Sequence, residues 1–434
     1  MPLTSLHVTN AWHATSGGIR TFYSALLEAA NREHRHVVVV APAARDSVEP
    51  VGRFGRIHFV AAPSAPFFDR RYRMLYPYQY LPGFSGRVAQ ILEDVRPDLV
   101  EIADKYSLVY LAGVLRKRWL PRVPRPVLVG LSCERFDDNM SAYLSNSPLA
   151  RRFTRWYLRR IYGPPFDVHV ANSAYTAAEL REAMPDRPAS FIQVCPIGVD
   201  ADGFGPRRRS QAVRAQLLRR TGGDRQTRLL LYAGRLSPEK NLSLLVETLE
   251  QLYASGDQDF RLVVAGDGPH AEWLRRQSLR ESLRGRVVLL GNLDRESLAS
   301  CYASCDVFVH PNPREPFGIG PLEAMASGVP VVAPNSGGVL TYANDGNAWL
   351  AEATAPAFAA AVRAAAQGDR VRVRAAEETA KAFRWEDATR RYFALYDHLY
   401  RDAHGRAPAC HSVAGDASDT DEVGASKIVL IEEA

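Results

Sequence analysis

The amino-acid sequence predicts an α/β protein with two Rossmann-like, doubly wound domains that face each other across a cleft. Two observations carry this prediction. Apolar strand-like runs alternate with helical runs along most of the chain, and a segment rich in Pro, Gly and charge interrupts the alternation at residues 194–210. Apolar strands that alternate with helices are typical of mostly parallel sheets covered on both faces. A chain of 434 residues also exceeds one ordinary core.

The first domain is expected over residues 1–198 and the second over residues 199–384. Strand-like runs of the first domain are SLHVTN, HVVVVAP, RIHFVAA, DLVEIAD, PVLVGLS and VHVANS. The second domain repeats the pattern with RLLLYAGR, FRLVVAGDG, RVVLLGN, DVFVHP and VPVVAP, each separated by a helical run. The polar, small-residue tail over residues 405–434 is expected to be disordered.

Composition excludes several classes of protein. The chain is 46% hydrophobic and 24% charged, which is typical of a globular protein. No apolar run is long enough to cross a membrane, and the first residues lack the pattern of a signal peptide. The five cysteines have no metal-binding spacing and are expected to be reduced cytosolic thiols, which predicts a cytoplasmic protein. Neither zinc-finger spacing nor an aromatic RNA-binding run accompanies the net charge of +6, so no nucleic-acid partner is expected.

Parallel sheets bind ligands in the loops beyond the carboxyl ends of their strands, so these loops are the candidate sites. The first such loop, NAWHATSGGIRTF, places Gly17 and Gly18 directly before a helix. Backbone N–H groups at a helix start can bind an anion, although a plain tight turn has the same sequence. Another loop, VVAGDGPHAEWL, contains Gly266 and Gly268 but lacks the last Gly of a dinucleotide motif.

The loop LYAGRLSPEKNL follows the first strand of the second domain. Arg235 and Lys240 stand close to the expected helix start, where Ser237 is a candidate N-cap and Pro238 a first helical residue. Two fixed cations beside a helix N-terminus suit a diphosphate group. We therefore expect a phosphate clamp here.

Two carboxylates surround the small loop REPFGIGPLEAMASG. Glu315 precedes the loop and Glu323 follows it, on a helix that is expected to begin near Pro321. Glu323 is then expected in the first helical turn, where the dipole stabilises a carboxylate. The pair can accept hydrogen bonds from hydroxyls at two ends of one polyhydroxylated ligand. Free amides of the intervening loop, residues 317–320, complete the expected site.

Taken together, these motifs resemble the family 4 retaining glycosyltransferases, whose fold is called GT-B. The resemblance extends over about residues 5–400 and rests on SGGIRTF, ANSAYTAAEL, PIGVD, LYAGRLSPEKN, VVAGDGP, VVLLGNL and EPFGIGPLEAMASGVPVVAPNSGG. The segment FRWEDATRRYFALY resembles the family's C-terminal helix, which implies that residues 385–403 pack back on the first domain.

The resemblance implies a role for each matching residue. Arg235 and Lys240 would neutralise the leaving diphosphate of a nucleotide sugar, Glu315 would hold sugar hydroxyls, and Glu323 would bind the ribose. The remaining donor contacts would come from Gly17, Gly18, Asn292, Leu293, Phe317, Gly318, Ile319 and Gly320. The family needs no metal ion or other cofactor for this reaction, and the Asp-x-Asp pair at Asp200 and Asp202 is interpreted as structural.

Two departures from the family affect the catalytic details. Many relatives have a His at the end of a first-domain strand, where this chain has Ser132, Cys133 and Glu134. His13 is the candidate substitute. Relatives also often have a Glu at the position of Thr341.

On the acceptor side, the segment RRFTRWYLRRIYG combines five arginines with an apolar stripe of Phe153, Tyr157 and Ile161. Two interpretations remain open: a surface helix packed on its own domain by this stripe, or a basic amphipathic helix that lies on an anionic membrane. The second interpretation predicts a protein peripheral to the inner face of the membrane, with a lipid or glycan acceptor.

The sequence thus predicts a retaining, metal-independent hexosyltransferase that uses a UDP- or GDP-sugar. A GT-B epimerase and a non-catalytic sugar-nucleotide-binding subunit are the alternatives, the latter because of the missing His. An NAD oxidoreductase is disfavoured because no complete G-x-G-x-x-G is present.

Overall fold

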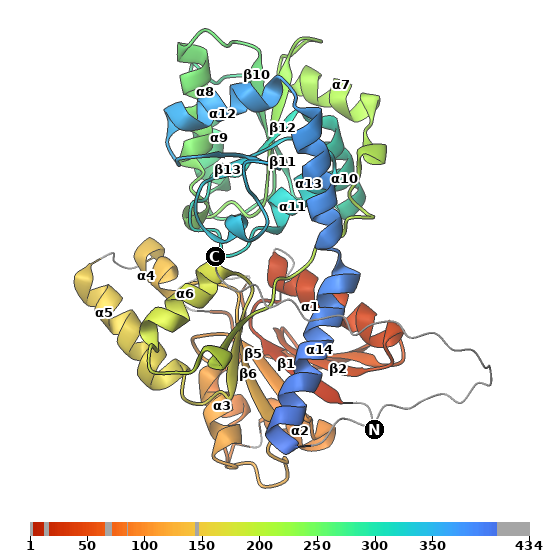
Figure 1. Cartoon of the computed structure of the whole chain (residues 1–434), viewed down its shortest axis with the longest axis vertical. Helices are drawn as coiled ribbons and strands as arrows, with labels where there is room; N and C mark the ends of the chain where they lie inside the picture. Colours follow the sequence, from red (N-terminus) through yellow and green to blue (C-terminus); the bar gives the residue numbers. More distant parts are fainter. Residues whose placement is uncertain (1–2, 13–16, 66–71, 85, 144–146, 406–434) are drawn as a thin grey trace, which may run out of the picture.

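The structure is a computed structural model that describes residues 3–12, 17–65, 72–84, 86–143 and 147–405. It has two α/β units stacked end to end, each with a central sheet (Figure 1). The expected fold class is therefore confirmed. His13 and the tail beyond Gly405 lie outside the described residues.

The first sheet has the strand order β3-β4-β2-β1-β5-β6-β7-β8. All of its pairs are parallel except β3 with β4. Strands β1, β2, β5 and β6 are buried nearly throughout, as apolar runs such as HVVVV require in a sheet with two covered faces. Its strands are β1 Thr4–Thr9, β2 His36–Ala43, β3 Ser47–Val51, β4 Gly55–Ala61, β5 Leu99–Ala103, β6 Val127–Ser132, β7 Val168–Ala171 and β8 Ile192–Val194.

The second sheet is parallel and has the order β11-β10-β9-β12-β13-β14. The order reverses between β9 and β12, so the loops after these strands flank the crevice in which such sheets bind ligands. Its strands are β9 Arg228–Ala233, β10 Phe260–Ala265, β11 Val287–Gly291, β12 Val307–Val309, β13 Val331–Pro334 and β14 Trp349–Ala351.

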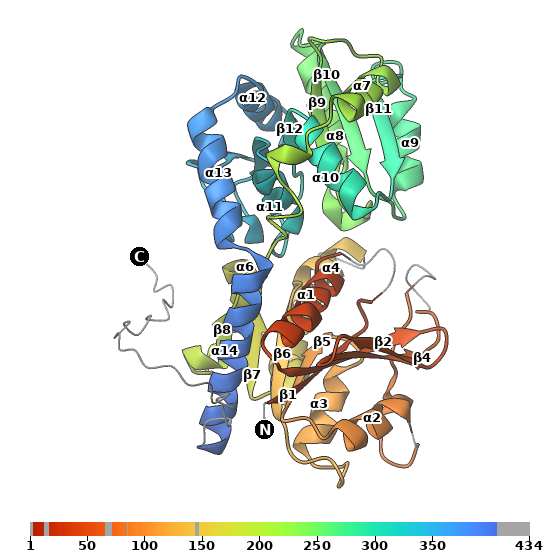
Figure 2. The same ribbon diagram turned by 90° about the vertical axis from the view of Figure 1, so that its right-hand side faces the viewer.

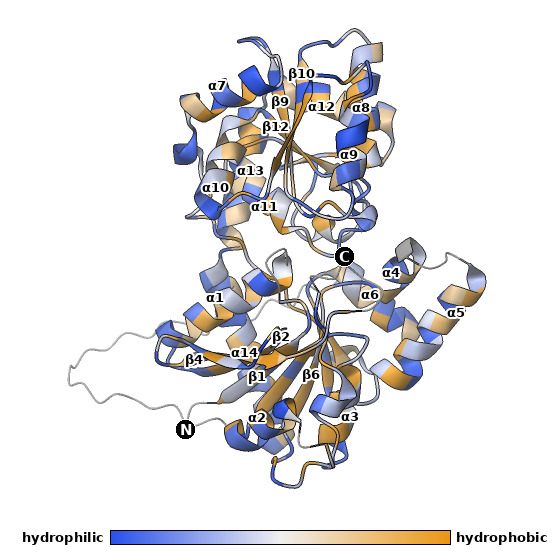
Figure 3. Ribbon diagram, turned by 180° about the vertical axis from the view of Figure 1, so that it is seen from behind, coloured by the Kyte–Doolittle hydropathy of each residue, from blue (hydrophilic) through white to orange (hydrophobic). Residues whose placement is uncertain are grey.

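Helices cover the sheets. Figure 3 shows largely hydrophobic strands such as β1 and β6 and a largely hydrophilic α9. None of the helices in the described ranges is both long and apolar enough to cross a bilayer. The first unit contains α1 Gly18–Arg32, α2 Arg87–Val95, α3 Val109–Arg116, α4 Phe136–Tyr143, α5 Pro148–Tyr157 and α6 Ala174–Ala183. The second contains α7 Gln211–Arg220, α8 Ser243–Ala254, α9 Ala271–Ser278, α10 Arg295–Ser304, α11 Ile319–Ala326, α12 Ala355–Ala366 and α13 Arg370–Ala382.

The last helix, α14 Trp385–His404, leaves the second unit and runs along the first (Figure 2). The Tyr396 hydroxyl donates a hydrogen bond of 2.7 Å to the buried carboxylate of Glu101 on β5. His7 on β1 lies 3.0 Å from the other oxygen of the same carboxylate. Buried polar groups that are satisfied in this way fix the position of the helix on the sheet.

The sequence interpretation missed three strands and misplaced the start of α8. β3 is an exposed antiparallel edge strand containing Pro50, and β8 and β14 have three residues each, so none shows a buried apolar run. The expected helix start at Pro238 is wrong: residues Pro238–Lys240 form a separate 3-10 turn, Asn241 has a left-handed conformation, and α8 begins at Ser243. The side chain of Ser237 donates to Glu239 and caps no helix.

Candidate active site

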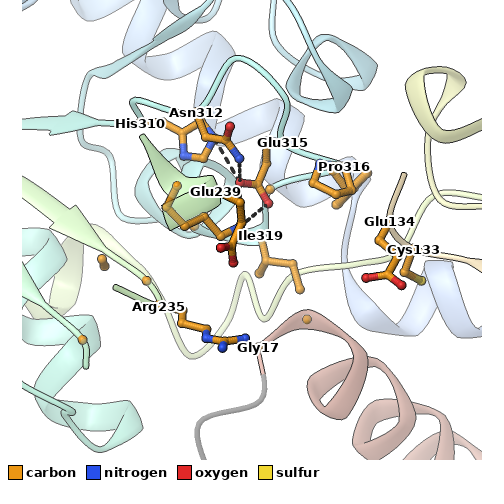
Figure 4. Close-up of a pocket in the computed structure, with 18 of the residues that line it drawn as sticks. Gly17, Cys133, Glu134, Arg235, Glu239, His310, Asn312, Glu315, Pro316 and Ile319 are labelled. Carbon is orange, nitrogen blue, oxygen red and sulfur yellow. Dashed lines mark hydrogen bonds and ion pairs between the residues drawn. The ribbon is translucent and has the colours of Figure 1, made fainter. Parts of the chain in front are cut away.

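A pocket of about 770 Å³ lies between the two units, at the carboxyl ends of strands from both sheets. The structure brings all the residues of the expected donor site together around it (Figure 4). These residues are Gly17, Gly18, Arg235, Lys240, Asn292, Leu293, Glu315, Phe317, Gly318, Ile319, Gly320 and Glu323.

Glu315 is held by several partners in the pocket. Its oxygens lie 3.0 and 2.8 Å from the Nζ of Lys240, and Asn312 donates a further hydrogen bond of 3.0 Å. The Nε2 of His310 is 3.5 Å away. Burial alone raises the pKa of Glu315, but Lys240, His310 and Asn312 outweigh it and hold the pKa at about 2. Glu315 is therefore an ionised acceptor over the whole physiological pH range.

His310 and Asn312 are site residues that the sequence analysis missed. Both follow β12 directly, in the segment DVFVHPNP. Parallel sheets bind ligands beyond the carboxyl ends of their strands, so this position could have identified both residues. Burial, helped by Lys240, lowers the pKa of His310 to about 4 against the opposing effect of Glu315. The imidazole is thus neutral at neutral pH.

Arg235 extends from the loop after β9 toward Gly17 in the first unit (Figure 4). Its guanidinium lies over the ring of Tyr72, 4.8 Å from the centroid, which the sequence analysis did not foresee. Gly18 approaches the opposite loop so closely that a Cβ would lie 3.2 Å from the Cδ1 of Ile319. The two units thus meet at the point where the expected clamp faces the expected anion-binding turn.

Gly266 and Gly268 are required for close packing of two loops, not for binding a dinucleotide. A Cβ on Gly266 would lie 1.9 Å from the carbonyl oxygen of Gly234, and one on Gly268 would lie 2.3 Å from that of Leu236. Both glycines have positive φ angles. They allow the loop after β10 to pack directly on the loop that carries Arg235.

The expected position of Glu323 in a first helical turn is wrong, because α11 begins at Ile319 rather than at Pro321. Glu323 therefore lies one turn further into the helix, away from the free amides at its start. The Tyr302 hydroxyl donates a hydrogen bond of 2.9 Å to its carboxylate. Burial dominates its environment and raises the pKa of Glu323 to about 7.

The first unit contributes Cys133, Glu134 and Asn139 to the pocket. Cys133 and Glu134 directly follow β6, where many relatives have the expected His. The Nδ2 of Asn139 donates a hydrogen bond of 2.9 Å to the carboxyl of Glu134. Burial raises the pKa of the Cys133 thiol well above its usual range.

The Asp-x-Asp pair does not line the pocket. Asp200 accepts a hydrogen bond of 2.9 Å from the backbone of Gly203 and pairs with Arg295, whereas Asp202 pairs with Arg384 at 3.4 Å. Across the described ranges, no three His, Cys, Asp or Glu side chains form a group that could hold a metal ion. Thr341 lies in the short 3-10 turn Gly338–Thr341.

The arginine segment forms α5 and continues as the π-helical turn Leu158–Tyr162. The expected apolar stripe of this segment is only partly buried. Tyr157 is buried and donates a hydrogen bond of 2.7 Å to the carbonyl of Lys105, whereas Phe153 is 48% exposed. Phe153 instead belongs to an exposed apolar row with Leu149 and Trp156. The exposed arginines of this segment are Arg151, Arg152, Arg155, Arg159 and Arg160.

Comparisons with known proteins agree with this architecture. Residues 16–202 match the model of Glycosyltransferase Family 4, and residues 214–382 match that of Glycosyl transferases group 1. The chain is 28% identical, over 96% of its length and 99% of the relative, to the GDP-mannose-dependent alpha-(1-6)-phosphatidylinositol dimannoside mannosyltransferase of Mycobacterium tuberculosis. It is 28% identical to a GDP-mannose-dependent alpha-mannosyltransferase of Corynebacterium glutamicum, over 80% of this chain and 75% of that one.

Among solved structures, sucrose-phosphate synthase from Thermosynechococcus elongatus superposes with a TM-score of 0.73 at 21% identity, covering 92% of this chain and 100% of that chain. This likeness concerns the fold. The two family models lie on either side of residues 203–213 and include the loops that carry Gly18, Arg235 and Glu315. The chain therefore belongs to the family 4 glycosyltransferases and has the GT-B fold.

Proposed function

We propose that the chain transfers a hexose from GDP-mannose or a closely related nucleotide sugar to a hydroxyl group of a lipid or glycan acceptor. The transfer retains the configuration of the sugar and needs no metal ion or other cofactor. The observation that supports this proposal is the set of cations and carboxylates on one wall of the pocket: Arg235, Lys240 and Glu315 lie on adjacent loops, and Glu323 lies on α11.

Arg235 and Lys240 stabilise the diphosphate as it leaves. Charge develops on the leaving phosphate when the bond to the anomeric carbon breaks, and preorganised cations stabilise that charge. The ammonium of Lys240 has three N–H donors, so it can contact a phosphate while keeping its ion pair with Glu315. The amides at Gly17 and Gly18 face the diphosphate from the first unit.

The two glutamates bind different sugars of the donor. Glu315, ionised beside Lys240, accepts hydrogen bonds from hydroxyls of the hexose, with the loop Phe317, Gly318, Ile319 and Gly320 lining the same part of the pocket. Glu323 accepts hydrogen bonds from the ribose hydroxyls. Asn292 and Leu293, after β11, contact the base. The names of two relatives favour GDP-mannose over a UDP-sugar.

The acceptor is proposed to be lipid-linked and presented at an anionic membrane surface, on the cytoplasmic side. One relative is named for a phosphatidylinositol dimannoside acceptor. The exposed row of Leu149, Phe153 and Trp156 beside the five arginines of α5 and the following turn suits such a surface. Apolar residues insert at the boundary of the acyl chains while arginines contact the anionic headgroups.

The donor is tested by thermal unfolding with GDP, UDP, ADP and their sugars. A ligand that binds only the native state raises the melting temperature. At a concentration of 100 times its Kd, it increases the free energy of unfolding by about 2.7 kcal/mol. We expect GDP and GDP-mannose to give the largest shifts. A larger shift with UDP-glucose would assign the base differently, and no shift with any nucleotide would contradict the donor site.

Turnover separates this proposal from the two alternatives. Incubation of GDP-mannose with vesicles that contain phosphatidylinositol should release GDP and label the lipid with mannose. A binding subunit would bind the donor without releasing GDP. An epimerase would change the hexose while leaving the acceptor unlabelled.

A further inference from the structure

Glu134 lies where the first unit faces the reacting end of the expected donor. It follows β6 at the carboxyl edge of the first sheet and lines the pocket. Figure 4 shows it with Cys133 across the pocket from Arg235 and His310. If the donor lies against the second unit, an attacking hydroxyl must reach the anomeric carbon from the side that carries Glu134.

The contacts of Glu134 hold its main chain in place and leave its carboxyl facing the pocket. The ammonium of Lys105 donates to the Glu134 carbonyl oxygen at 2.5 Å, and to the carboxylate of Glu179 at 2.7 Å. The carboxyl of Glu134 receives its hydrogen bond from Asn139 at one oxygen, Oε2. Lys105 therefore anchors the backbone rather than neutralising the side chain by direct contact.

The neighbouring carboxylate on α4 is placed differently. Asp138 accepts a hydrogen bond of 2.5 Å from the Tyr175 hydroxyl and pairs with Arg314 of the second unit at 3.6 Å. Asp138 thus joins the two units, whereas Glu134 has room to bind a ligand. A carboxylate is a strong acceptor for a hydroxyl proton, and charged hydrogen bonds are about twice as strong as neutral ones.

We propose that Glu134 accepts a hydrogen bond from the hydroxyl that attacks the donor sugar and thereby orients that hydroxyl for transfer. This inference rests on the proposed function. Correct orientation of the attacking group lowers the barrier because less freedom is lost on reaching the transition state. The same contact orients a water molecule when no acceptor is present, so Glu134 also accelerates hydrolysis of the donor.

The charges around Glu134 predict the pH at which it works. Burial raises its pKa above the ordinary 4.5; Asp104 and Glu179 raise it further, while Lys105 and Asn139 lower it. Tyr106, Tyr162 and the Cys133 thiol also lie near Glu134 and carry no charge near neutral pH, because burial raises the pKa of each. The hydrolysis rate at saturating donor should therefore rise with pH as Glu134 ionises, above the range of an ordinary carboxyl.

The decisive variant is Glu134→Gln, which keeps the shape and an acceptor oxygen for Asn139 but removes the charge. The control is Glu182→Gln, an exposed carboxylate on α6 of the same unit. The measurements are GDP release from GDP-mannose in water, the Kd of GDP-mannose, and the melting temperature. We expect hydrolysis by Glu134→Gln to fall by about tenfold or more, the loss expected for one charged hydrogen bond, with Kd unchanged.

Two further results are expected: Glu134→Gln loses the acidic limb of the hydrolysis profile, and the control behaves as the parent protein. Hydrolysis within twofold of the parent, or an equal loss of donor affinity and turnover, would overturn the inference. If the parent protein itself fails to bind or hydrolyse GDP-mannose and UDP-glucose, the proposed function fails instead. The two failures are therefore distinguishable.

Discussion

Lys240 and Glu315 form an ion pair inside the pocket, with the Lys240 Nζ 2.8 Å from the Glu315 Oε2. Glu315 is 8% exposed, so its charge depends on this partner. Lys240 thus has two functions in the proposed mechanism: it neutralises a buried carboxylate before the donor binds, and it stabilises the diphosphate as it leaves. Arg235 instead lies over the ring of Tyr72.

Replacement of the two cations by alanine should therefore give different results. Lys240→Ala and Arg235→Ala should each reduce turnover by about 100-fold, corresponding to about 3 kcal/mol of transition-state stabilisation. Lys240→Ala alone should also lower the melting temperature, because it leaves Glu315 buried without its partner. Steady-state kinetics and thermal unfolding measure both effects.

Lys381→Ala is the control for these variants. This lysine is half exposed on α13, where it pairs with Glu378 three residues earlier. It should leave turnover and melting temperature unchanged. Near-normal turnover in both pocket variants would contradict the diphosphate clamp.

The ion pair also gives a pH dependence of stability. The folded pKa of Glu315, about 2, lies below its unfolded value near 4.5. The stabilisation from its ionised form is therefore complete above pH 4.5 and is lost as the pH falls toward 2. Glu315→Gln should lack this acid-dependent loss, which a comparison of unfolding free energies at several pH values measures.

The sequence predicted that Arg235, Lys240, Glu315 and Glu323 would lie together, because the loops at the carboxyl ends of parallel strands meet at one edge of a sheet. It could not predict the partner of each residue. Tyr72 is distant from Arg235 in the chain, and their contact depends on how the two units meet. The helix start before Glu323 was misplaced because Pro321 is also tolerated inside the first turn of α11, one of several positions compatible with its fixed φ.

The sequence also could not show how much of the apolar stripe on α5 is covered. A spacing of four residues places Phe153 and Tyr157 on the same side of a helix, and the sequence contains both. Tyr157 stacks on Phe136 and is buried, whereas Phe153 remains exposed. Periodicity identifies an apolar face, but only the neighbouring elements decide how much of it is covered.

Glu323 should make nucleotide binding depend on pH near neutrality. Its pKa is about 7 because burial disfavours the ionised form. Ribose hydroxyls donate hydrogen bonds best to the ionised carboxylate, so affinity for free GDP should increase as the pH rises from 6 to 8. Glu323→Gln should bind GDP more weakly at pH 8 and lose this dependence, as titration calorimetry measures.

Glu315→Gln is the matched variant for this experiment, because Glu315 is proposed to contact the hexose rather than the ribose. It should bind free GDP as the parent protein does and discriminate less well between GDP-mannose and GDP-glucose. Equal loss of affinity for free GDP in both variants would refute the division of the two glutamates between hexose and ribose.

Chelation should leave the activity intact. Glu315, Glu323 and Glu134 accept hydrogen bonds from Lys240, Tyr302 and Asn139, respectively, and the diphosphate charge is assigned to Arg235 and Lys240. GDP release measured with and without EDTA should therefore be the same. Complete loss of activity with EDTA, restored by Mg²⁺ or Mn²⁺, would contradict the metal-independent mechanism.

The exposed row on α5 should attach the protein to anionic membranes. Trp156 is 50% exposed and Leu149 78% exposed, beside the exposed arginines 151, 152, 155, 159 and 160. Each arginine near an anionic surface contributes about 1 kcal/mol, an effect that fades over a Debye length of about 8 Å at physiological salt. The protein should therefore float with anionic vesicles at low salt and be released as the salt concentration increases.

Two triple variants distinguish membrane binding by the α5 surface from membrane binding by net positive charge alone. Replacement of Arg152, Arg155 and Arg159 by Gln should release the protein from the vesicles without changing donor hydrolysis. The control replaces Arg275, Arg276 and Arg280, which are exposed on and just after α9 of the second unit, and removes the same charge. The control should still float, because its arginines have no exposed apolar row like that of α5. If both variants float like the parent protein, or if the parent never floats at low salt, α5 is an ordinary packed surface helix and the lipid acceptor loses its structural support.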